Sequence, residues 1–323
     1  MNYYVGIDLG GTYIKGMIMD EALQVVIGKS TATPQKEPPQ SIFLAIINLI
    51  EFMAAESEID MEDVSGIGMG IPGLIDSRNN FVFNAANLGW INIDAGQYIQ
   101  EYFNKPVYTE NDGNINALGE MHFGAGRGFG NLLLLTLGTG LGSGFIINGE
   151  VLHGASHVAA EAGHMIIETD GARCSCGKRG CFESCCSATA FTRYAREIVK
   201  ENPDSLILQY ASGNLQAITG EMISKAWDEG DVAAKQVIEI FAQKLSIGLV
   251  NLINLFNPEI IIIGGGVSKS GERIMKPTRY HVENSLMHPI QRCKIVTGEL
   301  GSDAGVMGAC SLVAMHHKKN SNN

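Results

Sequence analysis

Four residues of the kinds that bind zinc lie within eighteen positions near the middle of the chain: His164, Cys174, Cys176 and Cys181. One histidine and three cysteines complete a tetrahedral zinc site, which leaves no coordination position open for water. We therefore predict a structural zinc and not a catalytic one. Disulfides are the alternative, but Cys174 and Cys176 are too close in sequence to bridge easily.

Two glutamates bracket this cluster, Glu161 three residues before the histidine and Glu183 two residues after the last cysteine. A metal that holds a loop also holds the side chains around it, as recognition of a polar ligand requires. The pattern predicts a zinc-bound loop that presents Glu161, His164 and Glu183 to a ligand.

A glycine-rich turn near the start of the chain separates two strand-like runs. Its backbone N–H groups and its threonine hydroxyl could contact phosphate oxygens, and the preceding aspartate could hold Mg²⁺ through water. An ordinary β-hairpin, with a turn acid and a solvated lysine, explains the pattern equally well. The residues concerned are Asp8, Gly10, Gly11, Thr12 and Lys15.

A second turn of the same kind follows the apolar run 132–135, and a strand pattern resumes at 145–147. Its central residues are Gly138, Thr139 and Gly140. Glycines at alternate positions indicate a backbone that something approaches closely, which makes a flexible loop the weaker explanation. The two turns lie roughly 125 residues apart and form an approximate internal repeat, such as a duplicated α/β fold would show.

Two further strand ends carry candidate residues. Asn111 and Asp112 stand between a short strand and a helix, where a carboxylate can serve as a catalytic base. A helix N-cap is the alternative, and spacing alone favours the cap. The apolar strand 259–263 opens onto Gly265 and Gly266, whose bare backbone suits either an adenine ring or a tight turn. The loop 84–90 reads as a polar surface loop whose tryptophan enters the core.

The remaining pattern is that of an α/β protein. Apolar periodicity predicts two helices within 222–256, broken near 228–231, and a small-residue helix at 303–315 that packs closely on another element. Residues 202–214 read as irregular. We predict a small first domain at 1–113, a larger domain with the zinc loop at 114–300, and a C-terminal segment, 301–323, that packs back on the first domain.

Composition restricts the function. The chain has 323 residues, 45% of them hydrophobic and 18% charged, as in a soluble globular protein. Its formal net charge of −11 argues against a nucleic-acid surface. The apolar runs are too short or too charged to cross a membrane, and the first residues do not read as a signal peptide. We expect a cytoplasmic protein with reduced cysteines and no membrane partner.

Several segments together resemble the motifs of the ROK family (repressor, open reading frame, kinase) over essentially the whole chain. They are DLGGTYIKG at 8–16, ENDGN at 110–114, TLGTGLGSG at 136–144, EAGH at 161–164 and CSCGKRGCFE at 174–183. The resemblance implies a two-domain actin/hexokinase-like (ribonuclease H-like) α/β fold with a cleft between the domains. It also implies phosphorylation of a sugar by Mg–ATP, a structural zinc near the sugar, and a homodimer or homotetramer.

The resemblance also implies roles for individual residues. Asp112 matches the family's catalytic base, and both glycine-rich turns match its phosphate loops. Gly265 and Gly266 are then expected beside the nucleotide. The residues expected around the sugar are Gly73, Asn87, Asn111, Asp112, Glu161, His164 and Glu183, with His164 shared with zinc.

Within the family the chain resembles the bacterial glucose kinases most, so the predicted reaction is phosphorylation of glucose at its 6-hydroxyl. Kinases for N-acetylmannosamine, N-acetylglucosamine, allose or fructose share the catalytic set and remain alternatives. The family's repressors carry a DNA-binding module before the first motif, which begins here at Asp8, so we do not expect a regulator. A non-catalytic sugar sensor is expected to lack Asp112 or one of the loops.

Overall fold

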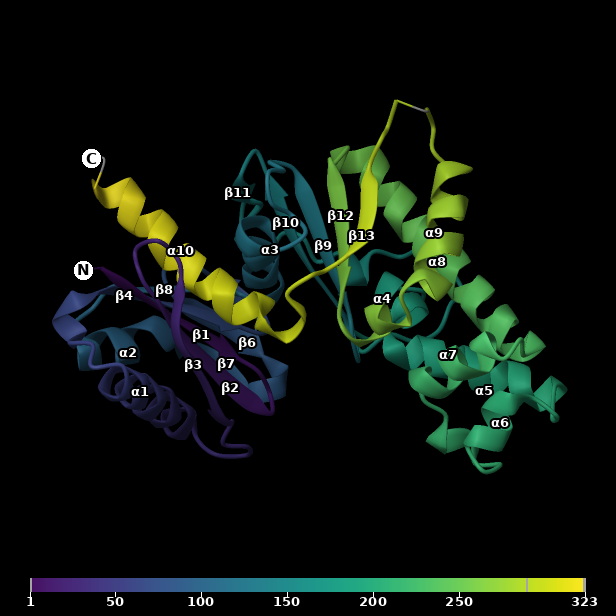
Figure 1. Ribbon diagram of the computed structural model, residues 1–323, viewed down its shortest axis with the longest axis horizontal. Helices are drawn as coiled ribbons and strands as arrows, with labels where there is room; N and C mark the ends of the chain where they lie inside the picture. The colour runs from purple at the N-terminus through teal and green to yellow at the C-terminus, as the bar shows by residue number, and fades with distance from the viewer. Residues whose placement is uncertain (1, 289, 322–323) are drawn as a thin grey trace. The chain divides into compact units, whose positions relative to one another are not determined.

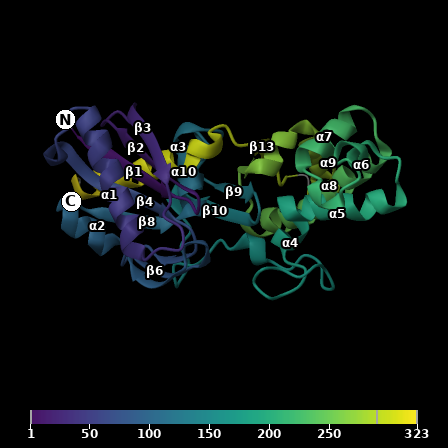
Figure 2. The same ribbon diagram turned by 90° about the horizontal axis from the view of Figure 1, so that it is seen from below.

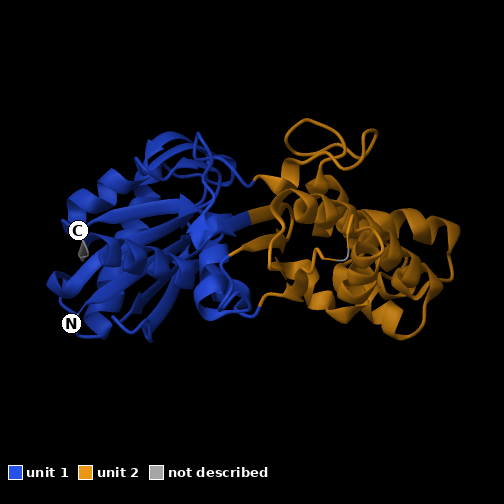
Figure 3. Ribbon diagram, turned by 90° about the horizontal axis from the view of Figure 1, so that it is seen from above, with its two compact units in different colours: residues 1–130, 144–160, 299–323 blue, residues 131–143, 161–298 orange. Residues whose placement is uncertain are grey.

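The computed structural model describes residues 2–288 and 290–321, and the chain divides into two compact α/β units (Figures 1 and 3). Unit 1 comprises residues 1–130, 144–160 and 299–323, and unit 2 comprises residues 131–143 and 161–298. The predicted domain boundary, at residue 113, falls inside helix α3 (Asp112–Phe123). The whole of this helix belongs to unit 1. The chain also returns to unit 1 at Gly144–Ala160, which the predicted domains did not include.

Unit 1 is built on a five-stranded sheet of order β3-β2-β1-β4-β8. Strands β1 (Tyr3–Leu9), β2 (Tyr13–Met19) and β3 (Val25–Ala32) form an antiparallel meander, while β4 (Val64–Ile71) and β8 (Val107–Asn111) run parallel to β1. The glycine-rich turn Gly10–Thr12 joins β1 to β2, as the sequence predicts.

Helices cover both faces of this sheet (Figure 1). Helix α1 (Pro39–Glu56) packs its apolar face on β2 and β3, and α2 (Ala95–Phe103) packs on β8; the short helix η1 (Met61–Asp63) precedes β4. On the other face, α10 (Ala304–Ser321) contacts β1, β4 and α3, after the short helix η6 (Gly301–Asp303). A β-carbon on Gly68 of β4 would lie only 2.1 Å from the carbonyl oxygen of Ala309, so glycine permits this close helix–sheet packing.

A small antiparallel sheet of three strands was not anticipated from the sequence. It has the order β5-β6-β7, with β5 (Leu74–Asp76), β6 (Phe81–Ala85) and β7 (Trp90–Asp94), and the short helix η2 (Ala86–Leu88) joins the last two. The segment predicted as a loop at 84–90 is therefore largely regular structure. Its tryptophan is buried as expected, and the Trp90 ring lies 5.2 Å from that of Phe43.

The second five-stranded sheet has the order β11-β10-β9-β12-β13. Strands β9 (Leu132–Leu137), β12 (Ile260–Gly264) and β13 (Lys294–Thr297) are parallel and belong to unit 2. Strand β10 (Leu141–Ile147) runs across the boundary between the units and pairs with β11 (Glu150–Val151). The second glycine-rich turn, at 138–140, joins β9 to β10.

The helices of unit 2 gather around the long helix α8 (Val232–Phe256), which contacts four of them (Figure 2). These are α4 (Phe182–Cys186), α5 (Ala188–Glu201), α7 (Gly220–Asp228) and α9 (Glu272–Glu283). The predicted break at 228–231 is confirmed, because Asp231 caps α8 by accepting a hydrogen bond from the Ala234 amide. The shorter helices are α6 (Leu206–Tyr210), η3 (Ala162–His164), η4 (Leu215–Ala217) and η5 (Gly266–Ser270).

Two of these findings bear on the predictions from sequence. The irregular structure predicted at 202–214 is correct except for the short helix α6, which Ser205 caps and whose Ile207 side chain is buried. Helices α1 and α8 are long and apolar enough to cross a membrane by length and composition alone, and each buries an apolar face within its own unit.

Candidate functional site

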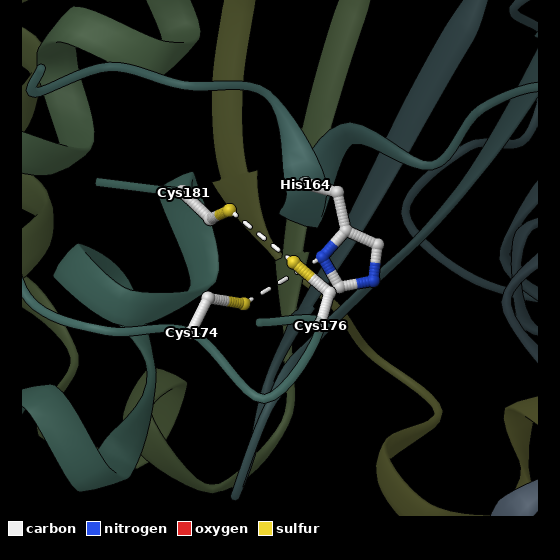
Figure 4. A group of neighbouring side chains, drawn as sticks. All are labelled: His164, Cys174, Cys176 and Cys181. Carbon is white, nitrogen blue, oxygen red and sulfur yellow. Dashed lines mark hydrogen bonds between the residues drawn. The ribbon is translucent and has the colours of Figure 1, made fainter. Parts of the chain in front are cut away.

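The four predicted metal ligands converge in unit 2 (Figure 4). Their ligand atoms all lie within 4.8 Å of one another. The sulfurs of Cys176 and Cys181 are 3.7 Å apart, and Nδ1 of His164 is 3.7 Å from the sulfur of Cys174. The sequence prediction that these residues form one cluster is confirmed.

This geometry fits a tetrahedral zinc ion. With Zn–S bonds of about 2.3 Å and a Zn–N bond of about 2.0 Å, a tetrahedron separates two sulfurs by ~3.8 Å and a sulfur from a nitrogen by ~3.5 Å. Burial and the neighbouring thiols also raise the pKa of Cys181 to about 12, so the ionised sulfurs that ligation requires need a cation among them. His164, Cys174, Cys176 and Cys181 would hold the zinc, and no fifth ligand is needed.

The backbone around the cluster forms a tight hairpin. Bridges join Ile166 to Cys181 and Arg173 to Arg179, and the Cys174 amide donates to the carbonyl of Lys178 at 2.8 Å. The four ligands therefore come from a short, locally hydrogen-bonded segment and from η3, which precedes it.

Glu183 connects the zinc loop to the second glycine-rich turn. Its Oε1 accepts a hydrogen bond from the Ser175 hydroxyl at 2.8 Å, and its Oε2 accepts one from the Leu141 amide at 3.1 Å. A β-carbon on Gly140 would lie 2.5 Å from Oε2, so the carboxylate occupies the space that a side chain at this position would need. The structure thus brings Glu183 and the predicted phosphate loop together.

The same turn is attached to the start of α5. The Ala188 amide donates to the carbonyl of Gly138 at 2.7 Å, and the Thr189 hydroxyl donates to the carbonyl of Thr139 at 3.1 Å. The β9–β10 turn is therefore held by α5 on one side and by the carboxylate of Glu183 on the other.

Glu161 and His164 belong to the segment that packs on β10. The Ala162 amide donates to the Ser143 hydroxyl at 3.1 Å, and a β-carbon on Gly163 would lie 2.3 Å from the Leu141 carbonyl oxygen. Gly163 therefore allows η3 to lie directly on the strand. Both Glu161 and His164 are exposed, as a ligand-binding role requires.

A cavity of about 560 Å³ opens beside η5 in unit 2. Gly266 lines it, whereas Gly265 packs against the end of β9, where a β-carbon would lie 2.5 Å from the Leu137 carbonyl oxygen. The two glycines predicted beside the nucleotide therefore differ, because only Gly266 faces the cavity. Helices α5 and α7 supply most of the other walls, including Phe191 and Lys225, and Arg273 of α9 also lines the cavity.

The first glycine-rich turn and its neighbours lie in unit 1. Asp8 and Lys15 are paired across β1 and β2, and the Gly10 amide donates to the Tyr13 carbonyl. Burial raises the pKa of Asp8 to about 6, although Lys15 acts in the opposite direction. The Lys15 ammonium also binds the Asp303 carboxylate at 2.9 Å.

Asn111, and not Asp112, is the N-cap of α3. Its Oδ1 accepts from the Gly113 amide at 2.8 Å, and its Nδ2 donates to the Gly73 carbonyl at 2.9 Å. Asp112 is the first helical residue, and its Oδ1 also accepts from the Gly113 amide, at 2.9 Å. The structure therefore gathers Gly73, Asn111 and Asp112, and places Asn87, in η2, beside Gly11.

One cluster of polar residues in unit 1 was missed from the sequence. The buried Glu110 binds Nε2 of His153 through its Oε2 at 2.6 Å. The His153 ring stacks on that of His157, with 4.7 Å between ring centres, and Nδ1 of His157 lies 2.9 Å from the Ser77 hydroxyl. The only sequence signal was the pair of histidines four residues apart, which carries little information by itself.

Comparisons with known proteins place this chain in a family. The ROK family model matches residues 4–316. A glucokinase of Halalkalibacterium halodurans is 38% identical over 314 residues, covering 96% of this chain and 94% of that protein. A xylose repressor of Caldicellulosiruptor bescii is 32% identical over 310 residues, covering 96% of this chain and 77% of that protein.

A solved structure agrees with these matches. The crystal structure of a ROK family glucokinase from Streptomyces griseus in complex with glucose and AMPPNP has a TM-score of 0.80 and 33% sequence identity, covering 96% of this chain and 99% of that chain. The chain belongs to the ROK family. The α/β fold with two actin/hexokinase-like units is thereby confirmed.

Proposed function

We propose that this ROK-family enzyme, an ATP-dependent hexose kinase, transfers the γ-phosphoryl group of ATP to the 6-hydroxyl of glucose with Asp112 as the general base. The observation that carries the proposal is the division of work at the start of α3. Asn111 caps the helix, and Asp112 follows as its first residue at the end of β8, the position at which a catalytic carboxylate is expected in α/β proteins; its Oδ1 accepts from the Gly113 amide at 2.9 Å. Near-complete coverage of a glucokinase supports glucose as the acceptor.

In the proposed reaction Asp112 accepts the proton of the 6-hydroxyl as its oxygen attacks the γ-phosphorus in line with the leaving ADP. Backbone N–H groups of Gly11, Thr12, Thr139 and Gly140 would contact phosphate oxygens, while the amides of Gly10 and Gly138 hold their own turns by bonds to Tyr13 and Gly140. Bound Mg²⁺ would neutralise charge on the phosphates. Asp8 would hold it through water, and Lys15 would exchange Asp303 for phosphate.

The sugar contacts follow from the zinc loop. Because Nδ1 of His164 points into the cysteine cluster, its Nε2 remains to hydrogen-bond a sugar hydroxyl. Glu161 and Glu183 would bind further hydroxyls, with Gly73, Asn87 and Asn111 completing the set. Zinc would hold the loop and take no part in the reaction.

The cavity beside η5 is the proposed adenosine site. Its volume of about 560 Å³ and its walls from α5, α7 and η5 suit a nucleoside, and Gly266 gives the ring direct access to backbone. Lys225 and Lys269 line it as well, while the charge of Arg273 is paired with Asp228. We also expect a cytoplasmic homodimer or homotetramer, as the resemblance implied, which light scattering on the purified protein would measure.

The test is a coupled assay of ADP release across a panel of hexoses with Mg–ATP. Glucose should be the best acceptor. Strong turnover of an N-acetylated hexosamine with none of glucose would refute the choice of sugar. Sugar binding without turnover of any acceptor would favour a sugar-responsive regulator, since a xylose repressor is among the relatives.

Asp112→Asn tests the base. The variant should bind glucose but lose turnover by at least about 100-fold, because the amide cannot accept the proton. Asp94→Asn is the matched control, since Asp94 is another acid at a helix start in unit 1 and only caps α2. Near-normal turnover by Asp112→Asn would show that another group serves as the base.

A further inference from the structure

The residue before Asn111 has a buried carboxylate that organises the start of α3. Glu110 is 3% exposed, and its Oε1 accepts hydrogen bonds from the Asn111 amide at 2.9 Å and from Nδ2 of Asn114 at 3.0 Å. Asn111 and Asn114 are the cap and the third residue of the helix. One carboxylate oxygen therefore holds both sides of the turn that contains Asp112.

The other oxygen of Glu110 is held by a histidine from a distant part of unit 1. Oε2 lies 2.6 Å from Nε2 of His153, whose side chain is 31% exposed. A backbone hydrogen bond closes the loop that begins at His153, since the Ala159 amide donates to the His153 carbonyl at 3.1 Å. The His157 ring covers the other side of the imidazole and is itself anchored at Ser77.

The charges around this pair favour a proton on His153. Its hydrogen bond to Glu110 raises the pKa of His153, whereas burial and the neighbouring positive charge of His153 lower the pKa of His157. Glu150 adds to the upward effect, while Arg78 opposes it. His316 of α10 also faces the pair, and burial lowers its pKa, so His153 is the member of this group that carries charge.

We propose that His153 is a positioning residue for Asp112: its imidazolium pairs with the buried Glu110 and so holds the β8–α3 turn in its reactive geometry. The proposal rests on the proposed function, in which Asp112 is the base. Removing the positive charge leaves a buried carboxylate without a counter-ion, which is costly, and the bonds from Oε1 to Asn111 and Asn114 loosen as Glu110 moves toward water. A displacement of about 1 Å at a reacting group can lower the rate about 100-fold.

The direction of the pH effect follows from the raised pKa of His153. The His153–Glu110 ion pair is fully formed below the ordinary pKa of histidine, about 6.5. It weakens as the pH rises through the higher pKa that His153 has in the folded protein. Turnover at saturating glucose should therefore fall at alkaline pH as His153 loses its proton.

The experiment compares the wild-type enzyme with His153→Gln, which keeps a hydrogen-bond donor and removes the charge. At every pH the variant should have a kcat about 10-fold or more below that of the wild type at pH 6.5, with a smaller rise in the KM for glucose, because Asn111 is also a proposed sugar contact. The kcat of the variant should not decline over the pH range in which His153 loses its proton in the wild type. A kcat within twofold of the wild type across the pH range would overturn the proposal.

A second measurement does not depend on whether this variant folds. Side-chain NMR of the wild-type enzyme should show His153 titrating above about 6.5, and Glu110→Gln should bring that midpoint down. An unchanged midpoint in Glu110→Gln would also overturn the proposal. His281→Gln is the matched control, because His281 forms a similar pair with Glu239 at 2.8 Å on the surface of unit 2. Its kcat should stay within twofold of the wild type.

These readouts separate the inference from the proposed function. Absence of hexose phosphorylation by the wild type, or full activity of Asp112→Asn, would contradict the proposed function, while the NMR midpoints would still report on the His153–Glu110 pair. Kinase activity that depends on Asp112 but not on His153 would contradict the inference alone.

Discussion

Gly140→Ala offers a direct test of how the zinc loop and the β9–β10 turn are joined. The added methyl group would lie 2.5 Å from Oε2 of Glu183, whereas ordinary contacts of a β-carbon are 3.4–4 Å. The carboxylate must therefore withdraw by roughly 1 Å, which stretches its 3.1 Å hydrogen bond from the Leu141 amide beyond bonding distance.

The expected cost can be assembled from two opposing effects. Loss of a hydrogen bond to a charged group costs about 1.5–3 kcal/mol, and the half-exposed position of Glu183 favours the lower part of that range. Replacement of glycine by alanine stabilises by about 0.4–1 kcal/mol through the unfolded chain. Gly140→Ala should therefore lower the stability of this turn by about 1–2 kcal/mol and raise the KM for glucose.

Hydrogen exchange of the Leu141 amide measures this effect locally, which avoids assuming a single unfolding transition for a chain of two units. Gly138→Ala is the control for local stability, because no atom lies within 4 Å of its added β-carbon. In a Glu183→Ala background, where the bond is already absent, Gly140→Ala should be neutral or slightly stabilising. If it costs as much there as in the wild type, displacement of Glu183 is not the cause.

Three other substitutions test separate features. Asp8→Asn should stabilise the protein at pH 7 by up to about 3 kcal/mol, because the pKa of Asp8 is raised to about 6 and its ionisation therefore costs stability as the pH rises from about 4. Urea unfolding should show that the variant loses this advantage below about pH 4. A variant less stable than the wild type at pH 7 would contradict the prediction. Ala160→Gly should stabilise by about 1 kcal/mol, since Ala160 has a φ of +67°, whereas the neighbouring Ala159→Gly should not. Cys176→Ser should lose zinc, as measured by elemental analysis, and should bind glucose more weakly. An unchanged glucose affinity in zinc-free protein would show that zinc does not support glucose binding.

Local sequence patterns predicted the parts of the site that lie within one segment. The spacing of Cys174, Cys176 and Cys181 foretold a metal cluster because a short hairpin brings such residues together without help from the rest of the fold. The glycine turns at 10–12 and 138–140 were found for the same reason. The roles of Asn111 and Asp112 could not be separated from spacing, since either side chain can cap a helix. The Gly113 amide donates to both side chains, and the extended backbone of Asn111 together with its second bond, from the Asn114 amide, identifies it as the cap.

The parts that sequence did not predict depend on contacts between distant segments. Glu110 and His153 are 43 residues apart and meet through the return of Gly144–Ala160 to unit 1. The same return explains why the compact units differ from the predicted domains, because no change in composition marks residue 144 or 160. The small sheet β5–β7 was missed because its strands are only three to five residues long and carry exposed residues at irregular positions.

The contacts of Glu183 show how the proposed structural zinc would influence the reaction without taking part in it. One oxygen of this carboxylate is bound by Ser175, which lies between two of the zinc ligands, and the other is bound by Leu141 at the end of the predicted phosphate loop. A change in the zinc loop therefore reaches the β9–β10 turn through the Glu183 side chain, in addition to the packing of η3 on β10. In the proposed function, the sugar contacts and the phosphate contacts of unit 2 are therefore coupled, and a variant that weakens one should weaken the other.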